Sequence, residues 1–339
     1  MSVTMRDIAR DLNVSVVTVS KVLRNHPDIG PATRERVLKR VKELHYQPNW
    51  AARSLVTGQS YTIGLVVPTM THPFFAEVAN GISRKIRRKG YSLVVSSSEE
   101  DAQLERMEIE HLLARQTDAL IIASVQTSIE SFVQIQKRGV PYILIDRNSP
   151  GLNSNYVGVD NEEIGMLATE HLIQNGRRRI AHIRGPDLST GQGRLDGYHN
   201  ALGRHGLKAL ASYVVRGQSY DENSEQSGYE AMQKLLSVKP LPDAVFCFND
   251  PLAIGAMRAV FEAGLRVPQN IALIGSGNLR FDEVLRVPLS SIDQGSVLTG
   301  ERAADLALQL IKRKDSVRTR EILLPIKVMA RASSLQIAH

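Results

Sequence analysis

Apolar residues recur every three to four positions through the start of the chain, which is the spacing of amphipathic helices. Thr4, with Asp7 three residues later, can form the capping box of a first helix. The apolar residues of that helix share one face: Met5, Ile8, Ala9 and Leu12. Asn13 then marks a turn, and Ser15 can cap a second helix. The pattern therefore predicts two short helices joined by a tight turn.

A third helix follows after a loop. The segment NHPDIGP interrupts the helical pattern, and within it Gly30 precedes Pro31, a residue favoured at the first position of a helix. The third helix is predicted over about residues 32–44. Its apolar stripe consists of Val37, Leu38, Val41 and Leu44. The buried side of the second helix consists of Val19, Val22 and Leu23.

From Tyr61 the pattern changes to apolar runs of strand length, separated by helical segments. The runs are TIGLVVP, YSLVVSS, ALIIAS, PYILID, RIAHIRG, SYVVRG, DAVFCFND and NIALIGS. Repeated strand–helix–strand alternation predicts parallel sheets that are buried on both faces. One open sheet usually holds fewer strands than these runs would form, and two doubly wound lobes are therefore expected. Residues 46–60 form a linker, in which a short helix can begin after Pro48.

Composition places the chain among ordinary globular proteins, with 42% hydrophobic and 23% charged residues. No apolar run reaches the roughly 18 residues that a membrane span needs, and the charged start MSVTMRDIARDL lacks the core of a signal peptide. Cys247 is the single cysteine, so no intramolecular disulfide can form. A cytoplasmic protein with no membrane partner is the simplest expectation.

Positive charge is concentrated in the first 60 residues, which we call the head. They hold ten lysines and arginines against five acidic residues, and so carry five of the seven net positive charges. A small basic head on a nearly neutral body suggests a polyanionic partner. On charge alone, a merely well-solvated helical head remains an alternative.

The second helix has the character of a recognition helix that lies in the DNA major groove. Its face opposite the apolar side carries Val16, Val17, Ser20, Lys21 and Arg24. Thr18 and Ser20 can donate to phosphates, and Lys21 can reach guanine acceptors. The two exposed valines can meet only thymine methyl groups. A core helix has the same spacing, so the capped helix pair, the basic charge and the linker together favour DNA binding.

These segments also resemble the LacI/GalR family of bacterial repressors. The resemblance rests on VTMRDIARDLNVSVVTVSKVLRN and TRERVLKRVKELHYQPNWAARSL, and on later landmarks in the same order. Those landmarks are IGLVVP, HPFFAEV, LIDR, VGVDN, GRLDGY, FNDPLAIGAMRAV, GLRVPQNIALIG, PLSSIDQ and LLPIKVMARASS. The resemblance covers essentially the whole chain.

The resemblance implies a helix–turn–helix domain, a hinge and an α/β effector-binding core of the periplasmic-binding-protein type I. The helix–turn–helix domain spans 1–46, the hinge helix and linker 47–60, and the core 61–339. The core then divides into an N-lobe, about 61–160 plus 291–322, and a C-lobe, about 161–290 plus 323–339.

The resemblance also implies DNA contacts. Val16, Val17 and Lys21 fall on base-reading positions. The positions that contact the DNA backbone are Thr18, Ser20, Thr33 and Arg34. PNWAARSL, which includes Ala52, resembles a hinge helix that folds in the minor groove, and Leu55 matches a leucine wedged between base pairs.

A small-molecule cleft is expected beyond the carboxyl ends of the core strands. The resemblance places around the ligand Phe74, Arg147, Thr190, Arg194 and Asn249, with Tyr220 as an aromatic wall. Other roles are open for two of these residues. Asn249 and Asp250 can cap the helix that begins at Pro251, and Arg194 can be a structural ion-pair partner.

One departure from the family bears on the ligand. Many members carry an aromatic residue and then an aspartate after IALIG, where this chain has Ser276 and Gly277. A carboxylate that faces the cleft in those members is then missing, while Arg147 and Arg194 are retained, and arginine pairs well with carboxylate or phosphate. The hypothesis is an acidic or phosphorylated sugar rather than a neutral one.

The expected mechanism is a population shift between two lobe arrangements, biased by the effector and by pseudo-palindromic double-stranded operator DNA. A homodimer is expected, because MARASSLQIAH carries no leucine heptads for a tetramer tail.

An enzyme is the main rival class. However, GSG at 275–277 is not a nucleophile elbow, and STGQGRLDG lacks the third glycine of a dinucleotide fingerprint. His72, His182 and His199 are interpreted as surface or satisfied residues rather than zinc ligands, and no cofactor or metal is expected. A pure ligand-binding protein, the second rival, would not need the basic head.

Overall fold

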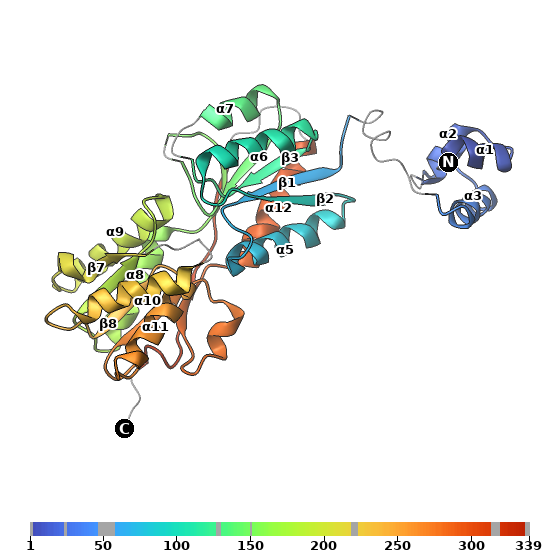
Figure 1. Cartoon of the computed structure of the whole chain (residues 1–339). Coiled ribbons are helices and arrows are strands. Elements are labelled where there is room, and N and C mark those ends of the chain that lie inside the picture. Colours follow the sequence, from blue (N-terminus) through green and yellow to red (C-terminus); the bar gives the residue numbers. More distant parts are fainter. Residues whose placement is uncertain are drawn as a thin grey trace. The chain divides into compact units, whose positions relative to one another are not determined.

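The computed structural model describes residues 3–23, 26–46, 58–126, 130–149, 151–217, 223–312 and 319–335. The chain divides into two compact units, Met1–Ser60 and Tyr61–His339, which correspond to the head and the core (Figure 1). No helix in these described ranges is long and apolar enough to span a membrane.

The head contains the three predicted helices, α1 (Met5–Asp11), α2 (Val16–Leu23) and α3 (Pro31–Glu43). Thr4 caps α1, and the Asp7 carboxylate accepts the Thr4 amide at 2.9 Å, which completes the predicted capping box. Ser15 Oγ accepts the Thr18 amide at the start of α2 at 3.0 Å.

A small apolar centre holds the three helices together. Its buried residues are Ile8, Ala9, Val19, Val22 and Val37. Leu38 departs from its prediction, since 46% of it is exposed. It follows Val37 directly, and one helical step turns it about 100° away from the centre.

Two six-stranded sheets make up the core in the described residues. The first has the order β11-β5-β4-β3-β1-β2 and the second β12-β10-β9-β8-β6-β7. The first sheet consists of β1 (Thr62–Val67), β2 (Ser92–Ser97), β3 (Ala119–Ile122), β4 (Tyr142–Ile145), β5 (Asn155–Gly158) and β11 (Glu321–Leu323). The second consists of β6 (Ile180–Arg184), β7 (Val214–Arg216), β8 (Ala244–Cys247), β9 (Ala272–Ser276), β10 (Ser290–Asp293) and β12 (Lys327–Met329).

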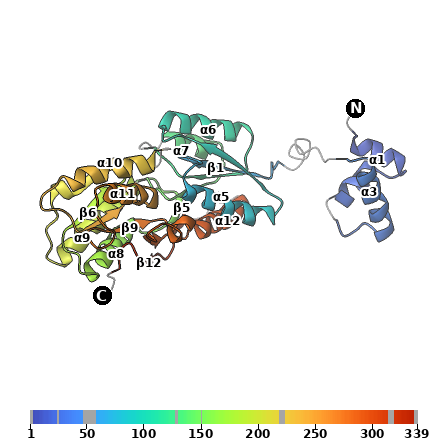
Figure 2. The same cartoon turned by 60° about the horizontal axis from the view of Figure 1, so that its bottom comes forward.

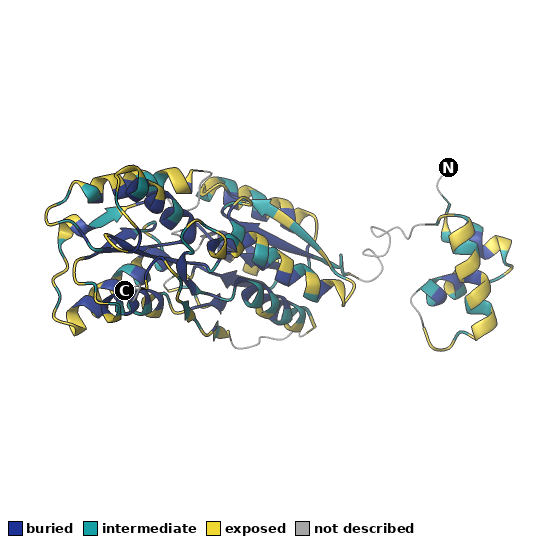
Figure 3. Ribbon diagram, turned by 90° about the horizontal axis from the view of Figure 1, so that it is seen from below, coloured by how far each residue is buried: buried dark blue, intermediate teal, exposed yellow. Residues whose placement is uncertain are grey.

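Strand pairing is parallel throughout both sheets except between β10 and β12. The predicted pair of doubly wound lobes is therefore confirmed. Buried strands lie between outer helices, whose outward faces are exposed (Figure 3).

Helices cover both faces of each sheet (Figures 1 and 2). In the first lobe, α5 (Pro73–Arg87) and α12 (Ser296–Lys312) lie on one face, and α6 (Ala102–Ala114) and α7 (Glu130–Lys137) on the other. In the second lobe, α8 (Asn161–Gln174) and α9 (Ser189–Arg204) lie opposite α10 (Ser224–Leu236) and α11 (Asp250–Glu262). The short helices η1 (Ala211–Tyr213) and η2 (Arg280–Glu283) complete the second lobe.

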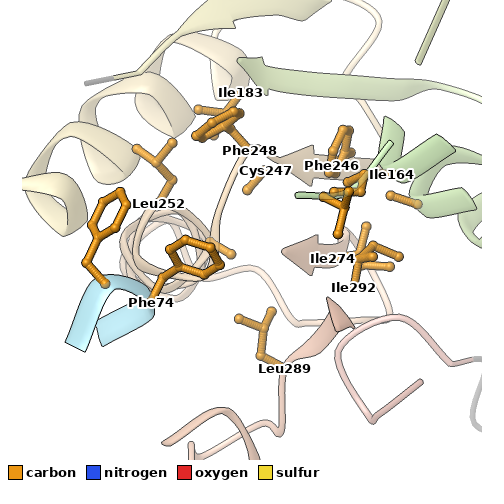
Figure 4. Packing of buried hydrophobic residues seen from close by; sticks show 14 of the residues in the cluster. Phe74, Ile164, Ile183, Phe246, Cys247, Phe248, Leu252, Ile274, Leu289 and Ile292 are labelled. Atoms are coloured by element: carbon orange, nitrogen blue, oxygen red, sulfur yellow. The ribbon is translucent and has the colours of Figure 1, made fainter. Parts of the chain in front are cut away.

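The chain crosses between the lobes three times, after β5, after β10 and between β11 and β12. The second crossing lies at 294–295, a few residues beyond the expected boundary, because β10 continues in the second sheet to Asp293. Buried side chains also join the lobes. Phe74 of the first lobe belongs to the same apolar cluster as Phe248 and Leu252 of the second (Figure 4).

Candidate functional site

The valines of α2 separate into two groups by burial. Val19 is fully buried and Val22 is 3% exposed, whereas Val16 is 39% and Val17 61% exposed. This is the division that the apolar pattern predicted. The helix therefore presents two valines to solvent at its beginning, where a recognition helix meets base edges.

Polar residues beside these valines make contacts within the head. Thr18 Oγ1 lies 2.9 Å from Ser15 Oγ in a hydrogen bond of the cap. Lys21 Nζ donates to Asp28 Oδ2 at 2.6 Å, and Arg34 Nη2 donates to the His26 carbonyl at 2.6 Å. Ser20 and Thr33 are half-buried. Three of the predicted contact residues lie outside the described residues: Ala52, Leu55 and Tyr220.

A cleft that is partly open to solvent lies between the two lobes of the core. It is lined by His72, Phe74, Asp146, Arg194, Asn249, Ser276, Gly277 and Gln294. The structure thus brings together three of the predicted ligand residues, Phe74, Arg194 and Asn249. Thr190 is fully buried at the start of α9 and does not line the cleft.

Arg194 is fixed by a contact on each of its three nitrogens. Nε donates to Asn161 Oδ1 at 3.0 Å, Nη1 to the Phe248 carbonyl at 2.5 Å, and Nη2 to Gln294 Oε1 at 2.9 Å. The guanidinium also stacks over the Phe248 ring, 4.3 Å from its centroid. The glycine at 165 lets α8 approach the Arg194 backbone, since a Cβ there would collide with the Arg194 carbonyl. Arg194 is therefore both structural and cleft-lining.

His72 and Asn249 meet across the cleft, with His72 Nε2 3.2 Å from Asn249 Nδ2. His72 Nδ1 lies 3.3 Å from the Phe74 amide nitrogen at the start of α5. Asn249 Oδ1 accepts the Leu252 amide and caps α11, which turns the side-chain NH₂ toward His72. The two side chains therefore form a hydrogen-bonded contact between the lobes at the cleft.

The ring of His72 is neutral at ordinary pH. Burial lowers its pKa to about 4, and the charges of Arg147 and Arg194 act in the same direction. His72 fits the interpretation as a satisfied residue, since both of its ring nitrogens have partners, and it also lines the cleft. His182 fits it only in part, because Nδ1 lies 2.9 Å from the Phe246 carbonyl while its buried Nε2 has no partner among the described residues.

Arg147 turns away from the cleft toward an acid of another loop. Its Nη2 donates to Glu100 Oε1 at 2.7 Å and its Nη1 to Glu100 Oε2 at 3.3 Å, and the side chain is only 2% exposed. Its neighbour Asp146 lines the cleft instead, with a φ of +62°. Burial raises the pKa of Asp146, while the charge of Arg147 opposes that rise. The cleft therefore has no carboxylate at Ser276 or Gly277, as expected, but Asp146 supplies a carboxyl group from the other lobe.

Behind the cleft wall, two buried aspartates, Asp250 and Asp282, lie together. Asp250 Oδ1 accepts the Ser291 hydroxyl at 2.7 Å, and its Oδ2 accepts the Leu279 amide at 3.3 Å. Burial raises the pKa of Asp282 to about 9, and the charge of Asp250 adds to the effect, so the pair holds a proton at neutral pH.

The same aspartate explains the departure at Gly277. A Cβ at that position would lie 2.7 Å from Asp250 Oδ2, and the φ of +143° disfavours any side chain. The wall is therefore built around the Asp250 carboxylate, which leaves no room for a larger residue at Gly277.

Two family models match the chain. Residues 4–49 match the bacterial regulatory proteins of the lacI family. Residues 60–332 match the periplasmic binding proteins and sugar binding domain of the LacI family. The ribose operon repressor of Escherichia coli K12 is 35% identical over 333 residues, which cover 98% of this chain and 99% of that protein.

Solved structures agree over the same length. The lac repressor dimer bound to operator and the anti-inducer ONPF superposes with a TM-score of 0.88 at 28% identity, covering 99% of this chain and 100% of that one. A LacI family regulator from Enterococcus faecium with bound ribose gives a TM-score of 0.72 at 26% identity, covering 82% of this chain and 100% of that one.

Proposed function

Because the chain belongs to the LacI family of bacterial regulatory proteins, we propose that a small neutral sugar controls its repression of a catabolic operon. The chain is similar over nearly its whole length to transcriptional repressors, so DNA-dependent repression is the activity of its family. The observation that carries the proposal is the inter-lobe cleft, in which hydrogen-bonding groups of both kinds surround an aromatic ring.

The polar groups of the cleft suit hydroxyl groups. Asp146 brings carboxyl oxygens, and the side chains of His72, Asn249 and Gln294 add hydrogen-bonding groups of both kinds. A sugar hydroxyl can donate and accept at once. Phe74 offers an apolar surface to the C–H face of a sugar ring.

Charge balance favours a neutral ligand over the acidic sugar expected from the sequence. Arg147 is neutralised by Glu100, and the Arg194 nitrogens already donate to three oxygens. The ribose bound to the Enterococcus faecium relative is a neutral sugar and supports the same choice.

A thermal-shift screen separates the two ligand classes. We expect pentoses and hexoses to raise the melting temperature, because a ligand that binds only the folded state stabilises it. The matched panel consists of the corresponding sugar acids and sugar phosphates. Stabilisation by the acidic panel alone would restore the acidic-sugar alternative and contradict the neutral one.

In the head, we assign base contacts to Val16, Val17 and Lys21. Backbone contacts are assigned to Thr18, Ser20, Thr33 and Arg34, and minor-groove contacts to Ala52 and Leu55. Exposed valines at the start of α2 support this assignment. The operator would be pseudo-palindromic and bound by a homodimer in the cytoplasm, as the operator-bound dimer of the lac repressor suggests.

We assign DNA binding to residues 1–46, the hinge helix and linker to residues 47–60, and effector binding to residues 61–339. The sugar and the operator would each bias the same equilibrium between lobe arrangements. The proposal predicts that a gel shift with upstream intergenic DNA responds to the sugar that the thermal screen identifies. Binding that ignores every stabilising sugar would contradict it.

A further inference from the structure

Lys21 is the one predicted base-reading residue with a charged side chain, and an acid of the next loop holds it. Its Nζ lies 2.6 Å from Asp28 Oδ2, and the side chains are 35% and 45% exposed. His26 Nδ1 lies 2.5 Å from the other oxygen of Asp28. The hydrogen bond from Lys21 lowers the pKa of Asp28, so the carboxylate is charged at neutral pH.

The loop that carries Asp28 is tied to α3. Arg34 Nη2 donates to the His26 carbonyl at 2.6 Å. The Lys21 ammonium therefore meets an acid whose own loop is anchored to the head. Other ion pairs of the described head, Asp7–Arg10 and those of Arg40 with Asp11 and Glu43, involve none of the predicted base-reading residues.

An ammonium group has three N–H donors, and the bond to Asp28 uses one of them. Two remain, which matches the O6 and N7 acceptors on the major-groove edge of guanine. Base reading depends on these directed hydrogen bonds. Attraction to phosphate depends mainly on net charge, and the Lys21–Asp28 pair carries none.

We propose that Asp28 determines specificity by confining Lys21 to base reading and cancelling its attraction to the phosphate backbone. The proposal rests on the proposed DNA-binding role of α2. Without Asp28, Lys21 would act as one more counter-charge on any DNA sequence, and the margin of operator over random DNA would shrink.

Non-specific binding tests the charge argument without knowledge of the operator. Full-length protein is titrated onto a fluorescent random-sequence duplex at several salt concentrations. For Asp28→Asn we expect the slope of log affinity against log salt to steepen by about 0.9 for each head on the DNA. When the salt concentration is lowered fourfold, the affinity of Asp28→Asn should therefore rise roughly threefold more for each head than that of the unaltered protein.

Two variants separate this effect from a general change in charge. Glu43→Gln removes the same charge from the end of α3, but Arg40 remains paired with Asp11. The salt slope of Glu43→Gln should therefore match that of the unaltered protein. In the Lys21→Gln background, Asp28→Asn should have no further effect on the slope. An equal slope change in that background, or none in Asp28→Asn alone, overturns the proposal.

Selection of tight binders from a random DNA pool supplies the specific site. The ratio of specific to random affinity should fall several-fold in Asp28→Asn, and an unchanged ratio also overturns the proposal. An unaltered protein that binds neither pool nor random duplex would overturn the DNA-binding role itself. A protein that binds both, with Asp28→Asn indistinguishable from it, would overturn only the role of Asp28.

Discussion

His72 and Asn249 form a hydrogen bond of 3.2 Å between Nε2 and Nδ2 across the cleft, one residue from each lobe. Each side chain is also fixed within its own lobe, because His72 Nδ1 lies 3.3 Å from the Phe74 amide nitrogen and Asn249 Oδ1 accepts the Leu252 amide. Both residues line the cleft, so a ligand there meets the pair that joins the lobes.

Asn249→Asp should uncouple this link while keeping the fold. An aspartate caps a helix as well as asparagine, so α11 should keep its start. Its second oxygen would replace the amide nitrogen that contacts His72 and bring a carboxylate into the cleft in place of a donor for ligand hydroxyls. We expect sugar affinity measured by calorimetry to fall at least tenfold, with little change in the free energy of unfolding.

Asn249→Ala is the matched comparison for that experiment. It loses the cap as well as the amide, so the free energy of unfolding should fall by about 1 kcal/mol. If Asn249→Asp bound sugar as tightly as the unaltered protein, the amide of Asn249 would have no role in ligand binding.

Asp282 makes the stability of the core fall as pH rises toward 9. Its folded pKa of about 9 lies above the ordinary value of 3.8. The stabilisation is complete below the ordinary value and is lost as pH rises toward 9, because only the unfolded chain releases the proton readily. Asp282→Asn should flatten the fall in unfolding free energy between pH 5 and pH 9, measured by denaturant titration.

The exposed Asp196 of α9 provides the control for that titration. Asp196→Asn removes a similar group outside the pair and should leave the pH dependence unchanged. A fall with pH that is equally steep in Asp282→Asn would show that the buried pair does not hold the proton.

Gly277→Ala should destabilise the core. The new Cβ would lie 2.7 Å from Asp250 Oδ2 on a backbone with a φ of +143°, and such strain costs on the order of 1–3 kcal/mol. Gly203 in α9 is the control, since no atom would lie within 4 Å of a Cβ there. Gly203→Ala should stabilise by about 0.5–1 kcal/mol through its helix propensity, as thermal denaturation can check.

Two valines of α2 should respond in opposite ways to truncation. Val17 is 61% exposed, so Val17→Ala should leave head stability within about 0.5 kcal/mol but loosen preference at one half-site position. Val19 is fully buried, and Val19→Ala should cost about 1–3 kcal/mol. Selection from a random DNA pool and thermal melting measure the two effects. An unchanged base preference in Val17→Ala would place this valine away from the bases.

Local chemistry made the head and most strands predictable. Caps at Thr4 and Ser15 depend on neighbouring residues, and long apolar runs reveal buried strands. The strands β5, β10, β11 and β12 did not appear among the predicted runs, because polar residues or glycine interrupt their short sequences NYVG, SSID, EIL and KVM. They are placed by their partners in the sheet rather than by their own pattern.

The cleft was predicted only in part, since its details depend on contacts distant in sequence. Phe74 and Asn249 could be found at strand ends. The choice between Asp146 and Arg147 could not, because Glu100 in another loop captures the arginine and a left-handed residue turns the aspartate inward. Gln294 gave no signal, since it lies on a crossing between lobes.

Reciprocal linkage tests the central claim most directly. Operator affinity is measured with and without the stabilising sugar, and sugar affinity with and without the operator. Coupling through one lobe equilibrium requires the same factor in both directions, in the range of about 5- to 150-fold. A sugar that binds tightly in the cleft yet leaves operator affinity unchanged would contradict the account.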